Sequence, residues 1–183
     1  MANNTDSVGF YAAEVLEATA ARQAHKTALI AKEEELSFGD LNQRVRALAG
    51  HLQQEGLRQG DRIGVLLPNS TAIPLSYFAS QKIGAVTVIL DARLKGKELE
   101  GVLKDADLKL LVVHSQLLAE VEEVFKTTTP VPLWIVGAEG ERAFEKRFAP
   151  SAGAHSLSRS NPDDDALILY TSGTTGEPKG VVL

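Results

Sequence analysis

The chain of 183 residues contains no cysteine, so its sequence excludes disulfide bonds, thiolate metal sites and a cysteine nucleophile. Long apolar runs are also missing, and the longest, such as AVTVIL at residues 85–90, are far too short to span a bilayer. The N-terminus, MANNTDSVGF, has neither the basic nor the apolar segment of a signal peptide. These absences predict a soluble, cytoplasmic protein without a membrane span.

Basic charge is also scarce. The chain has 19 Lys and Arg against 24 Asp and Glu, a net charge of −5, and no basic stripe. This balance argues against nucleic acid or an anionic membrane as the main partner, although a few local donors can still hold a small anionic ligand. With 44% hydrophobic and 23% charged residues, the composition and length fit about one globular domain.

The N-terminal third carries helical and hairpin patterns. Residues 9–23 have the spacing of an amphipathic helix, and residues 27–38 combine two short apolar pieces with a charged turn, as in a β-hairpin. A second helix is expected from Ser37 to about Gly56. Ser37 and Asp40 have the spacing of a capping box at its start, and the glycine supplies a stop.

From residue 62 on, strands and helices are expected to alternate along the chain. Apolar strand patterns lie at residues 62–67, 85–90, 108–113 and 132–137, and helical patterns lie at 71–83, 99–106 and 117–125. Strands that are nearly continuous in apolar residues are expected where helices cover both faces of a parallel sheet. The alternation predicts a three-layer α/β fold with a mainly parallel sheet flanked by helices.

The pattern weakens after the fourth of these strands. Residues 140–147 are expected to form a short helix, residues 149–165 have loop composition, and ALILYTS at 166–172 restores a strand. The three aspartates at 163–165 immediately precede that strand. We interpret them as a solvated turn rather than a metal site.

Several other polar and aromatic residues are interpreted as structural. The four histidines are scattered without the spacing of metal ligands, and none is given a role. Trp134 and Tyr170 lie on predicted strands and are expected in the core. Arg93 and Lys95 follow a predicted strand, and we expect a solvated loop there rather than contacts to phosphate.

The segment YTSGTTGEPKGV at residues 170–181 is rich in glycine and hydroxyl side chains and continues a predicted strand. Gly173, Gly176 and Gly180 permit positive φ and let the backbone approach a ligand closely. Successive backbone N–H groups and hydroxyls can then hold anionic oxygens, and Lys179 adds a full positive charge. These features predict a loop that binds a polyphosphate.

The spacing of this segment differs from two common phosphate-binding motifs. A Walker A loop needs Gly-x-x-x-x-Gly-Lys-Ser/Thr, but here Pro178 precedes Lys179 and Gly180 follows it. No Gly-x-Gly-x-x-Gly follows the first strand of the alternation, where a dinucleotide-binding fold carries it. The residues alone indicate a phosphate-binding loop of another kind. A flexible Ser/Thr/Gly linker and an unrelated phosphate-binding NTPase are the alternatives.

The same segment closely resembles the signature of the adenylate-forming, or AMP-binding, enzyme superfamily. Residues 36–70 and 82–94 are similar to two earlier blocks of that family, so the resemblance runs from about Val8 to the last residue. It is strongest to AMP-forming acyl-CoA synthetases. The resemblance implies that residues 1–183 are the N-terminal portion of the AMP-binding domain, ending just after the Gly-rich loop, with the C-terminal remainder of the family domain absent.

This resemblance implies the ATP-dependent activation of a small-molecule carboxylic acid to an acyl-adenylate, followed by transfer to CoA. The implied ATP contacts are Thr171, Ser172, Gly173, Thr174, Thr175, Gly176 and Lys179. Lys179 is also the implied catalytic residue, because its charge would stabilise the leaving pyrophosphate. Mg²⁺ is implied too, but the family's metal-binding Glu lies beyond residue 183, so no metal ligand is assigned in this chain.

Several alternatives to an acid–CoA ligase stay open. The chain can be a truncated, non-catalytic protein, or part of an amino-acid adenylation domain of a peptide synthetase; the acid and the oligomeric state are not predicted. Alone, the 183 residues are expected to bind ATP weakly and to make no thioester. The strand expected after Gly180 has only Val181, Val182 and Leu183, so the loop would be anchored on one side, and residues 172–180 are expected to be poorly ordered.

Overall fold

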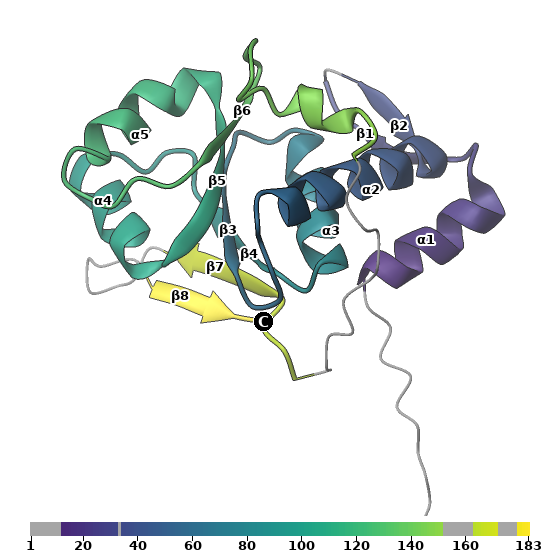
Figure 1. Cartoon of the computed structure of the whole chain (residues 1–183), viewed down its shortest axis with the longest axis horizontal. Helices are drawn as coiled ribbons and strands as arrows, with labels where there is room; N and C mark the ends of the chain where they lie inside the picture. Colours follow the sequence, from purple (N-terminus) through teal and green to yellow (C-terminus); the bar gives the residue numbers. More distant parts are fainter. Residues whose placement is uncertain (1–11, 33, 152–162, 172–178) are drawn as a thin grey trace, which may run out of the picture.

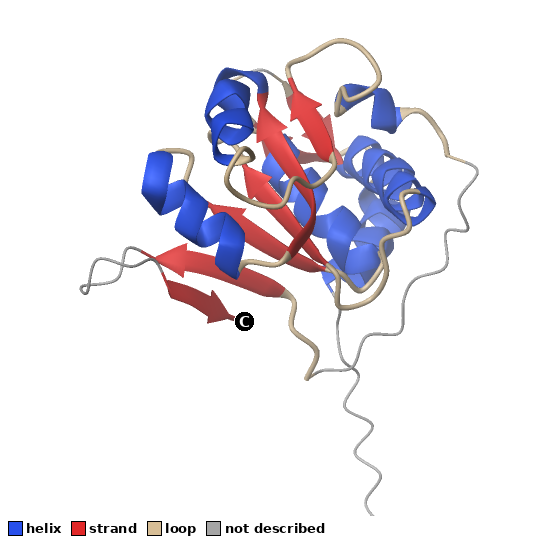
Figure 2. Cartoon of the chain, turned by 60° about the vertical axis from the view of Figure 1, so that its left-hand side comes forward, coloured by secondary structure: helices blue, strands red, loops and turns tan. Residues whose placement is uncertain are grey.

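A six-stranded sheet forms the centre of the molecule, with helices packed on both of its faces (Figure 1 and Figure 2). The computed structural model describes residues 12–32, 34–151, 163–171 and 179–183. In chain order its elements are α1 (Ala12–Gln23), β1 (Thr27–Ile30), β2 (Glu35–Ser37), α2 (Phe38–Gln54), β3 (Arg62–Leu66), α3 (Ala72–Lys82), β4 (Val86–Leu90), α4 (Gly96–Asp105), β5 (Leu108–His114), the 3-10 helix η1 (Ser115–Leu117), α5 (Leu118–Val124), β6 (Leu133–Val136), the 3-10 helix η2 (Glu145–Phe148), β7 (Leu167–Thr171) and β8 (Lys179–Val182).

The strand order of the sheet is β6-β5-β3-β4-β7-β8. The pairs β3–β4, β3–β5, β4–β7 and β5–β6 are parallel, and only β7–β8 is antiparallel. β1 and β2 form a separate antiparallel hairpin, as the sequence predicts. The predicted three-layer α/β fold with a mainly parallel sheet is confirmed.

Strand β5 shows why these strands are apolar on both sides. Leu110 and Val112 belong to the core that contains α2 and α3, whereas Leu111 and Val113 belong to the core that contains α4 and α5. Alternate side chains of a strand point to opposite faces of the sheet, so a strand covered on both faces needs apolar residues at every position.

The start of α2 follows the predicted cap only in part. The Oγ of Ser37 accepts a hydrogen bond from the backbone N–H of Asp40 at 3.1 Å. The Asp40 carboxylate, however, accepts a hydrogen bond from that same hydroxyl at 2.6 Å, not from the backbone N–H of Ser37 that a full capping box requires. A shorter helix is also found where residues 140–147 were expected to be helical, because η2 covers only Glu145–Phe148.

Helix α1 is attached to the rest of the molecule by an ion pair as well as by apolar contacts. The side chain of Lys82, at the end of α3, is only 2% exposed, and its ammonium group contacts the carboxylate of Glu17 on α1, which is 31% exposed. The pair therefore joins the first helix to the layer formed by α2 and α3. In the described part of the chain, no helix is both long and apolar enough to cross a membrane.

Candidate functional site

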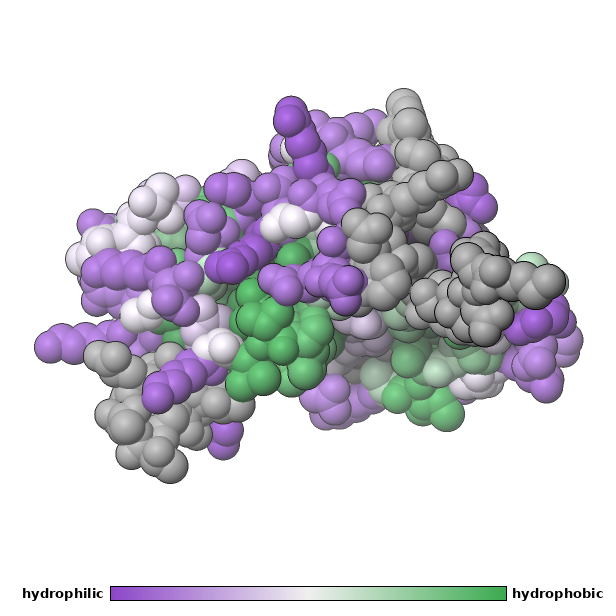
Figure 3. Space-filling view, turned by 90° about the horizontal axis from the view of Figure 1, so that it is seen from below, coloured by the Kyte–Doolittle hydropathy of each residue, from purple (hydrophilic) through white to green (hydrophobic). Residues whose placement is uncertain are grey.

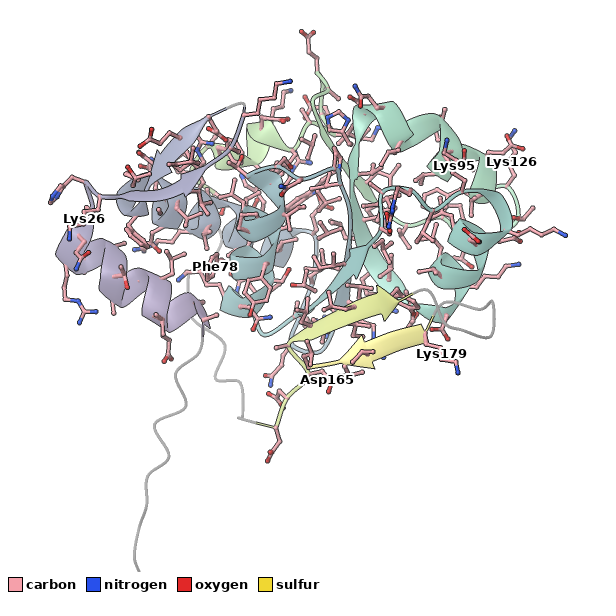
Figure 4. The ribbon with its side chains drawn as sticks, turned by 180° about the vertical axis from the view of Figure 1, so that it is seen from behind. Lys26, Phe78, Lys95, Lys126, Asp165 and Lys179 are labelled. Carbon is pink, nitrogen blue, oxygen red and sulfur yellow. The ribbon has the colours of Figure 1, made fainter. Side chains whose placement is uncertain are left out.

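The two ends of the Gly-rich segment meet at one edge of the sheet. Strand β7 ends at Thr171, β8 begins at Lys179, and these two residues are register partners in the antiparallel pair. Since β7 is parallel to β4, its last residue lies at the edge formed by the carboxyl ends of the parallel strands. Figure 4 shows Lys179 at the start of β8, beside the head of the β7 arrow.

Strand connections at this edge favour ligand binding. Strand β4 leads through α4 back to β5, on the far side of β3, whereas β7 leads the opposite way to β8. In open α/β sheets, ligands bind outside the carboxyl ends of the strands where neighbouring connections diverge in this way. The segment that joins β7 to β8 therefore starts and ends at a position suited to a ligand.

Two of the seven predicted ATP contacts lie in the described part of the chain. The fold places the backbones of Thr171 and Lys179 opposite each other, and the side chain of Lys179 is exposed. The other predicted contacts, Ser172, Gly173, Thr174, Thr175 and Gly176, lie outside the described residues. The structure thus places both ends of the predicted loop and leaves its centre as a prediction.

The expected one-sided anchoring of this segment is wrong. The ladder of β8 starts before Gly180, at Lys179, and the backbone N–H of Leu183 donates to the carbonyl of Leu167 at 2.9 Å. The carbonyl of Leu183 in turn accepts from the N–H of Ala166 at 2.9 Å. Four residues suffice for this strand because β7 supplies an antiparallel partner. Residues 179 and 180 of the expected loop are thus paired in β8, and residues 172–178 lie outside the described ones.

Gly180 has a different role from the predicted one. It lies in extended β8 without a positive φ, directly opposite Tyr170. A Cβ atom added at this position would lie 3.0 Å from Cγ2 of Ile168 and 3.4 Å from Cζ of Tyr170. The glycine therefore leaves room for two side chains of β7. Positive φ and close approach to a ligand were also predicted for Gly173 and Gly176, but these two residues lie outside the described part of the chain.

Tyr170 extends from β7 to the end of α4. Its hydroxyl donates a hydrogen bond of 2.5 Å to Oδ2 of Asp105, the last residue of that helix. The side chain is half-buried against the core formed with α4 and α5. Burial, and after it the hydrogen bond to Asp105, raises the pKa of the Tyr170 hydroxyl, so the group stays protonated and remains a donor. By contrast, Trp134 is buried in the core, as predicted.

The loop after the neighbouring strand β4 closes on itself. The carboxylate of Asp91 accepts hydrogen bonds from the backbone N–H of Arg93 at 2.9 Å and from its Nη2 at 2.6 Å. These contacts lower the pKa of Asp91 to about 2. The side chain of Arg93 is 90% exposed, in agreement with the predicted solvated loop.

The aspartates before β7 lie in an exposed segment. Asp163, Asp164 and Asp165 are exposed in a turn, and Figure 4 shows the last of them at the other end of β7 from Lys179. Within the described residues, no three His, Cys, Asp or Glu side chains are grouped so that they could hold a metal ion. The interpretation of these aspartates as a solvated turn agrees with the structure.

Strand β8 leaves apolar side chains on the surface. Val181, Val182 and Leu183 are 47%, 50% and 63% exposed. Figure 3, in which the molecule is seen from below, shows a hydrophobic patch on the side where the C-terminus lies. The outer strand of the sheet, which starts at the candidate site, thus exposes apolar side chains, whereas its first residue, Lys179, is charged.

The Gly-rich hairpin on a mainly parallel α/β sheet agrees with a comparison to known protein families. The profile of the family described as AMP-binding enzyme matches residues 16–183. The chain therefore belongs to the AMP-binding enzyme family, and the resemblance stated from the sequence is confirmed.

Curated relatives of the chain are ligases and a peptide synthase. Long-chain-fatty-acid–CoA ligase FadD13 of Mycobacterium tuberculosis is 30% identical over 147 residues, which are 80% of this chain and 29% of the relative. Crotonobetaine/carnitine–CoA ligase of Salmonella paratyphi B is 32% identical over 171 residues, 86% of this chain and 33% of the relative. Tyrocidine synthase 2 of Brevibacillus parabrevis is 30% identical over 170 residues, 93% of this chain but 4% of the relative. The chain thus spans a third or less of the length of these relatives.

Solved structures show the same fold. The anthranilate CoA ligase AuaEII in complex with anthranoyl-AMP superposes with a TM-score of 0.87 at 27% identity, over 94% of this chain and 34% of that one. The long-chain-fatty-acid–CoA ligase FadD1 from Archaeoglobus fulgidus has a TM-score of 0.84 at 31% identity, over 93% and 36%. Both are CoA ligases, and both share the arrangement of strands and helices described above.

Proposed function

We propose that the chain contributes to the ATP-dependent activation of a carboxylic acid to an acyl-adenylate, whose acyl group is then transferred to CoA. Membership of the AMP-binding family and similarity to two CoA ligases support this proposal. The observation that carries it is the β7–β8 hairpin, in which Thr171 and Lys179 pair at the carboxyl edge of the sheet and fix both ends of the signature segment. Residues 1–183 would be the N-terminal portion of the AMP-binding domain that carries this loop.

The proposed first step is an attack by a carboxylate oxygen on the α-phosphorus of ATP. A new carboxylate–phosphorus bond forms, the bond to the bridging oxygen breaks, and pyrophosphate leaves with the bonding electrons. Negative charge therefore builds up on the β- and γ-phosphates, where preorganised donors lower the barrier most effectively. In the second step, the thiol sulfur of CoA attacks the acyl carbon and AMP leaves.

The donors for the pyrophosphate would come from the hairpin. Lys179 offers an exposed ammonium group at the start of β8. The hydroxyl side chains and backbone N–H groups of residues 171–176 would add neutral donors around it. Mg²⁺ would screen the same phosphates, but the described residues contain no group of acidic side chains that fits a metal ion, so we assign no metal ligand to this chain.

A second candidate function differs in the acceptor. The similarity to tyrocidine synthase 2 extends over 93% of this chain. It favours the alternative that the chain is part of an amino-acid adenylation domain, which transfers an activated amino acid to a carrier protein. Both candidates share the first step and the same use of the hairpin. They differ in which acids support adenylation and in whether CoA accepts the acyl group.

Exchange of pyrophosphate into ATP tests the shared first step. The assay uses the full-length protein that contains these 183 residues, incubated with ATP, labelled pyrophosphate and one acid at a time from a panel of fatty, aromatic and amino acids. We expect label in ATP only with cognate acids, and formation of the matching CoA thioester when CoA is added. Exchange with amino acids alone, and no CoA thioester, would favour the peptide synthetase candidate. Bound ATP without exchange for any acid would contradict both.

A further inference from the structure

The side chain of Tyr170 connects three elements around the candidate loop. It starts on β7, passes over Gly180 of β8 and reaches Asp105 at the end of α4. The hydrogen bond from Tyr170 places the end of α4 close to β7. The pair Tyr170–Gly180 is the register pair directly next to Thr171–Lys179, where the loop begins and ends.

We propose that Tyr170, Gly180 and Asp105 form a latch that holds both stems of the ATP loop against α4 and so positions Lys179. This inference rests on the proposed function, and it assigns Tyr170 and Asp105 as positioning residues, not as groups that touch ATP. The latch also explains why the residue after Lys179 is a glycine. With no side chain at position 180, the tyrosine ring lies over β8 and its hydroxyl reaches Asp105.

The space around Gly180 supports this assignment. An added Cβ would lie 3.0 Å from Ile168, which is closer than ordinary van der Waals contact. It would lie 3.4 Å from the ring of Tyr170, which is at the limit of such contact. Ile168 would have to move by a few tenths of an ångström, whereas the ring of Tyr170 would be in ordinary contact with the new methyl group. The hydrogen bond of 2.5 Å to Asp105 is short and directional, so a displacement of the ring by the shifted Ile168 would lengthen it.

The exposure of β8 explains why a latch matters here. All four residues of this strand are exposed, and β7 is its only neighbour within the sheet. Loop stems with few buried contacts open easily. A misplacement of about 1 Å in a group that stabilises a transition state can reduce the rate by about 10². A bond that fixes the stems next to Lys179 would therefore act on the rate of the chemical step.

Hydrogen exchange of the β8 amides tests the latch without any assay of activity. We expect faster exchange at residues 179–182 in Tyr170→Phe, which removes only the hydroxyl, and in Asp105→Ala. Gly180→Ala should have the same effect although it leaves both partners in place. Asp105→Asn keeps an acceptor and should restore slow exchange. Tyr77→Phe, at a half-buried tyrosine of α3, is the control and should leave β8 unchanged.

Pyrophosphate exchange into ATP then tests the positioning role. We expect Tyr170→Phe and Asp105→Ala each to lower kcat about tenfold or more, with little change in the KM for the acid, and Asp105→Asn to recover most of the rate. The double variant should lose no more than either single variant, because both changes break one bond.

The two readouts separate the latch from the proposed function. Unchanged β8 exchange in Tyr170→Phe, or additive losses in the double variant, would overturn the latch. A rise in KM for the acid at constant kcat would overturn its positioning role. If the unaltered protein exchanges no pyrophosphate with any acid, the proposed function fails, and the amide exchange still decides whether the latch exists.

Discussion

Lys179 carries the only full positive charge in the signature segment 170–181. Its removal should therefore affect the step in which pyrophosphate takes up negative charge. In the complete enzyme, we expect Lys179→Ala to slow adenylate formation by about 10² or more, in the range found for the loss of one preorganised donor. The measurement is pyrophosphate exchange into ATP with a cognate acid.

The control for this change is Lys26→Ala. Lys26 is also exposed, but it lies at the far end of the molecule from Lys179 (Figure 4). Its removal changes the net charge equally and should leave the exchange rate unaltered. Equal rates for both variants and the unaltered protein would show that Lys179 is not an ATP contact.

Asp91 offers a second test at the scale of a residue. Its hydrogen bonds to Arg93 lower its pKa from the ordinary 3.8 to about 2. A depressed pKa in the folded state means that the contribution of the pair to stability is present above about pH 4. This contribution is lost as the pH falls through about 2. NMR titration of the Asp91 carboxyl should show the low pKa, and Arg93→Gln should return it towards 3.8.

Arg22→Gln, on α1, removes a positive charge elsewhere and should leave the pKa of Asp91 low. The turn that Asp91 and Arg93 form lies at the carboxyl end of β4, next to β7 in the sheet. If Asp91 titrates near its ordinary value in the unaltered protein, the turn does not hold its side chains as described.

At the scale of elements, the attachment of α1 depends on a buried charge. Lys82 is 2% exposed, and Glu17 is the carboxylate that its ammonium group contacts. Glu17→Ala would leave a buried ammonium group without this partner. We expect a loss of stability on the order of 2 kcal/mol, less than the about 3–5 kcal/mol for fully buried pairs, because Glu17 itself stays partly solvated.

Urea unfolding measures this loss, and Glu14→Ala is the matched control. Glu14 lies on the same helix but is exposed, so its removal should change the free energy of unfolding by less than about 0.5 kcal/mol. Glu17→Gln keeps an acceptor for the ammonium group and should fall between the two. Similar values for all three variants would mean that the pair does not hold α1.

The elements differ in how far the sequence predicts them. The four parallel strands β3 to β6 were predicted as short, nearly continuous apolar runs because most of their residues are buried under helices. β7 was predicted from the apolar start of ALILYTS, although Ile168 is the only one of its described side chains that is fully buried. β8 was expected only as the short strand after Gly180. Its first two residues, Lys179 and Gly180, were missed, because they carry no strand pattern and only pairing with β7 makes them extended. The order of the strands in the sheet was not predicted either, because it depends on packing between distant segments.

Some features of the candidate site could likewise be predicted from the sequence, and others could not. The signature segment was found from sequence because its residue types and their order are specific. Asp105 was not, because it lies 65 residues before Tyr170 and a single aspartate at a helix end has no distinguishing pattern. From the sequence, Gly180 was predicted to let the backbone approach a ligand. Its actual role could not be predicted, since only the fold shows which side chains lie opposite it.

For the molecule as a whole, we expect a polypeptide of residues 1–183 alone to bind Mg–ATP weakly and to make no thioester. The hairpin anchors both ends of the loop, but phosphate contacts by themselves must still offset the cost of ordering a glycine-rich segment. The chain also spans a third or less of its curated relatives. Calorimetry with Mg–ATP, and a thioester assay with mixed acids, measure both expectations. Turnover by this polypeptide, free of host ligases, would contradict them.

The place of β7 in the sheet also affects how the chain assembles while it is being synthesised. Strand β7 pairs with β4, but it begins about 80 residues after β4 ends, so at 5–20 residues per second roughly 4–16 s pass before the ribosome delivers it. During that time β4, with the sequence VTVIL, is an outer strand of the growing sheet, which reaches four strands only after β6 is made, and it presents unpaired backbone groups. Such an edge readily pairs with other chains. Nascent chains of this protein should therefore depend on chaperones until the last strands arrive.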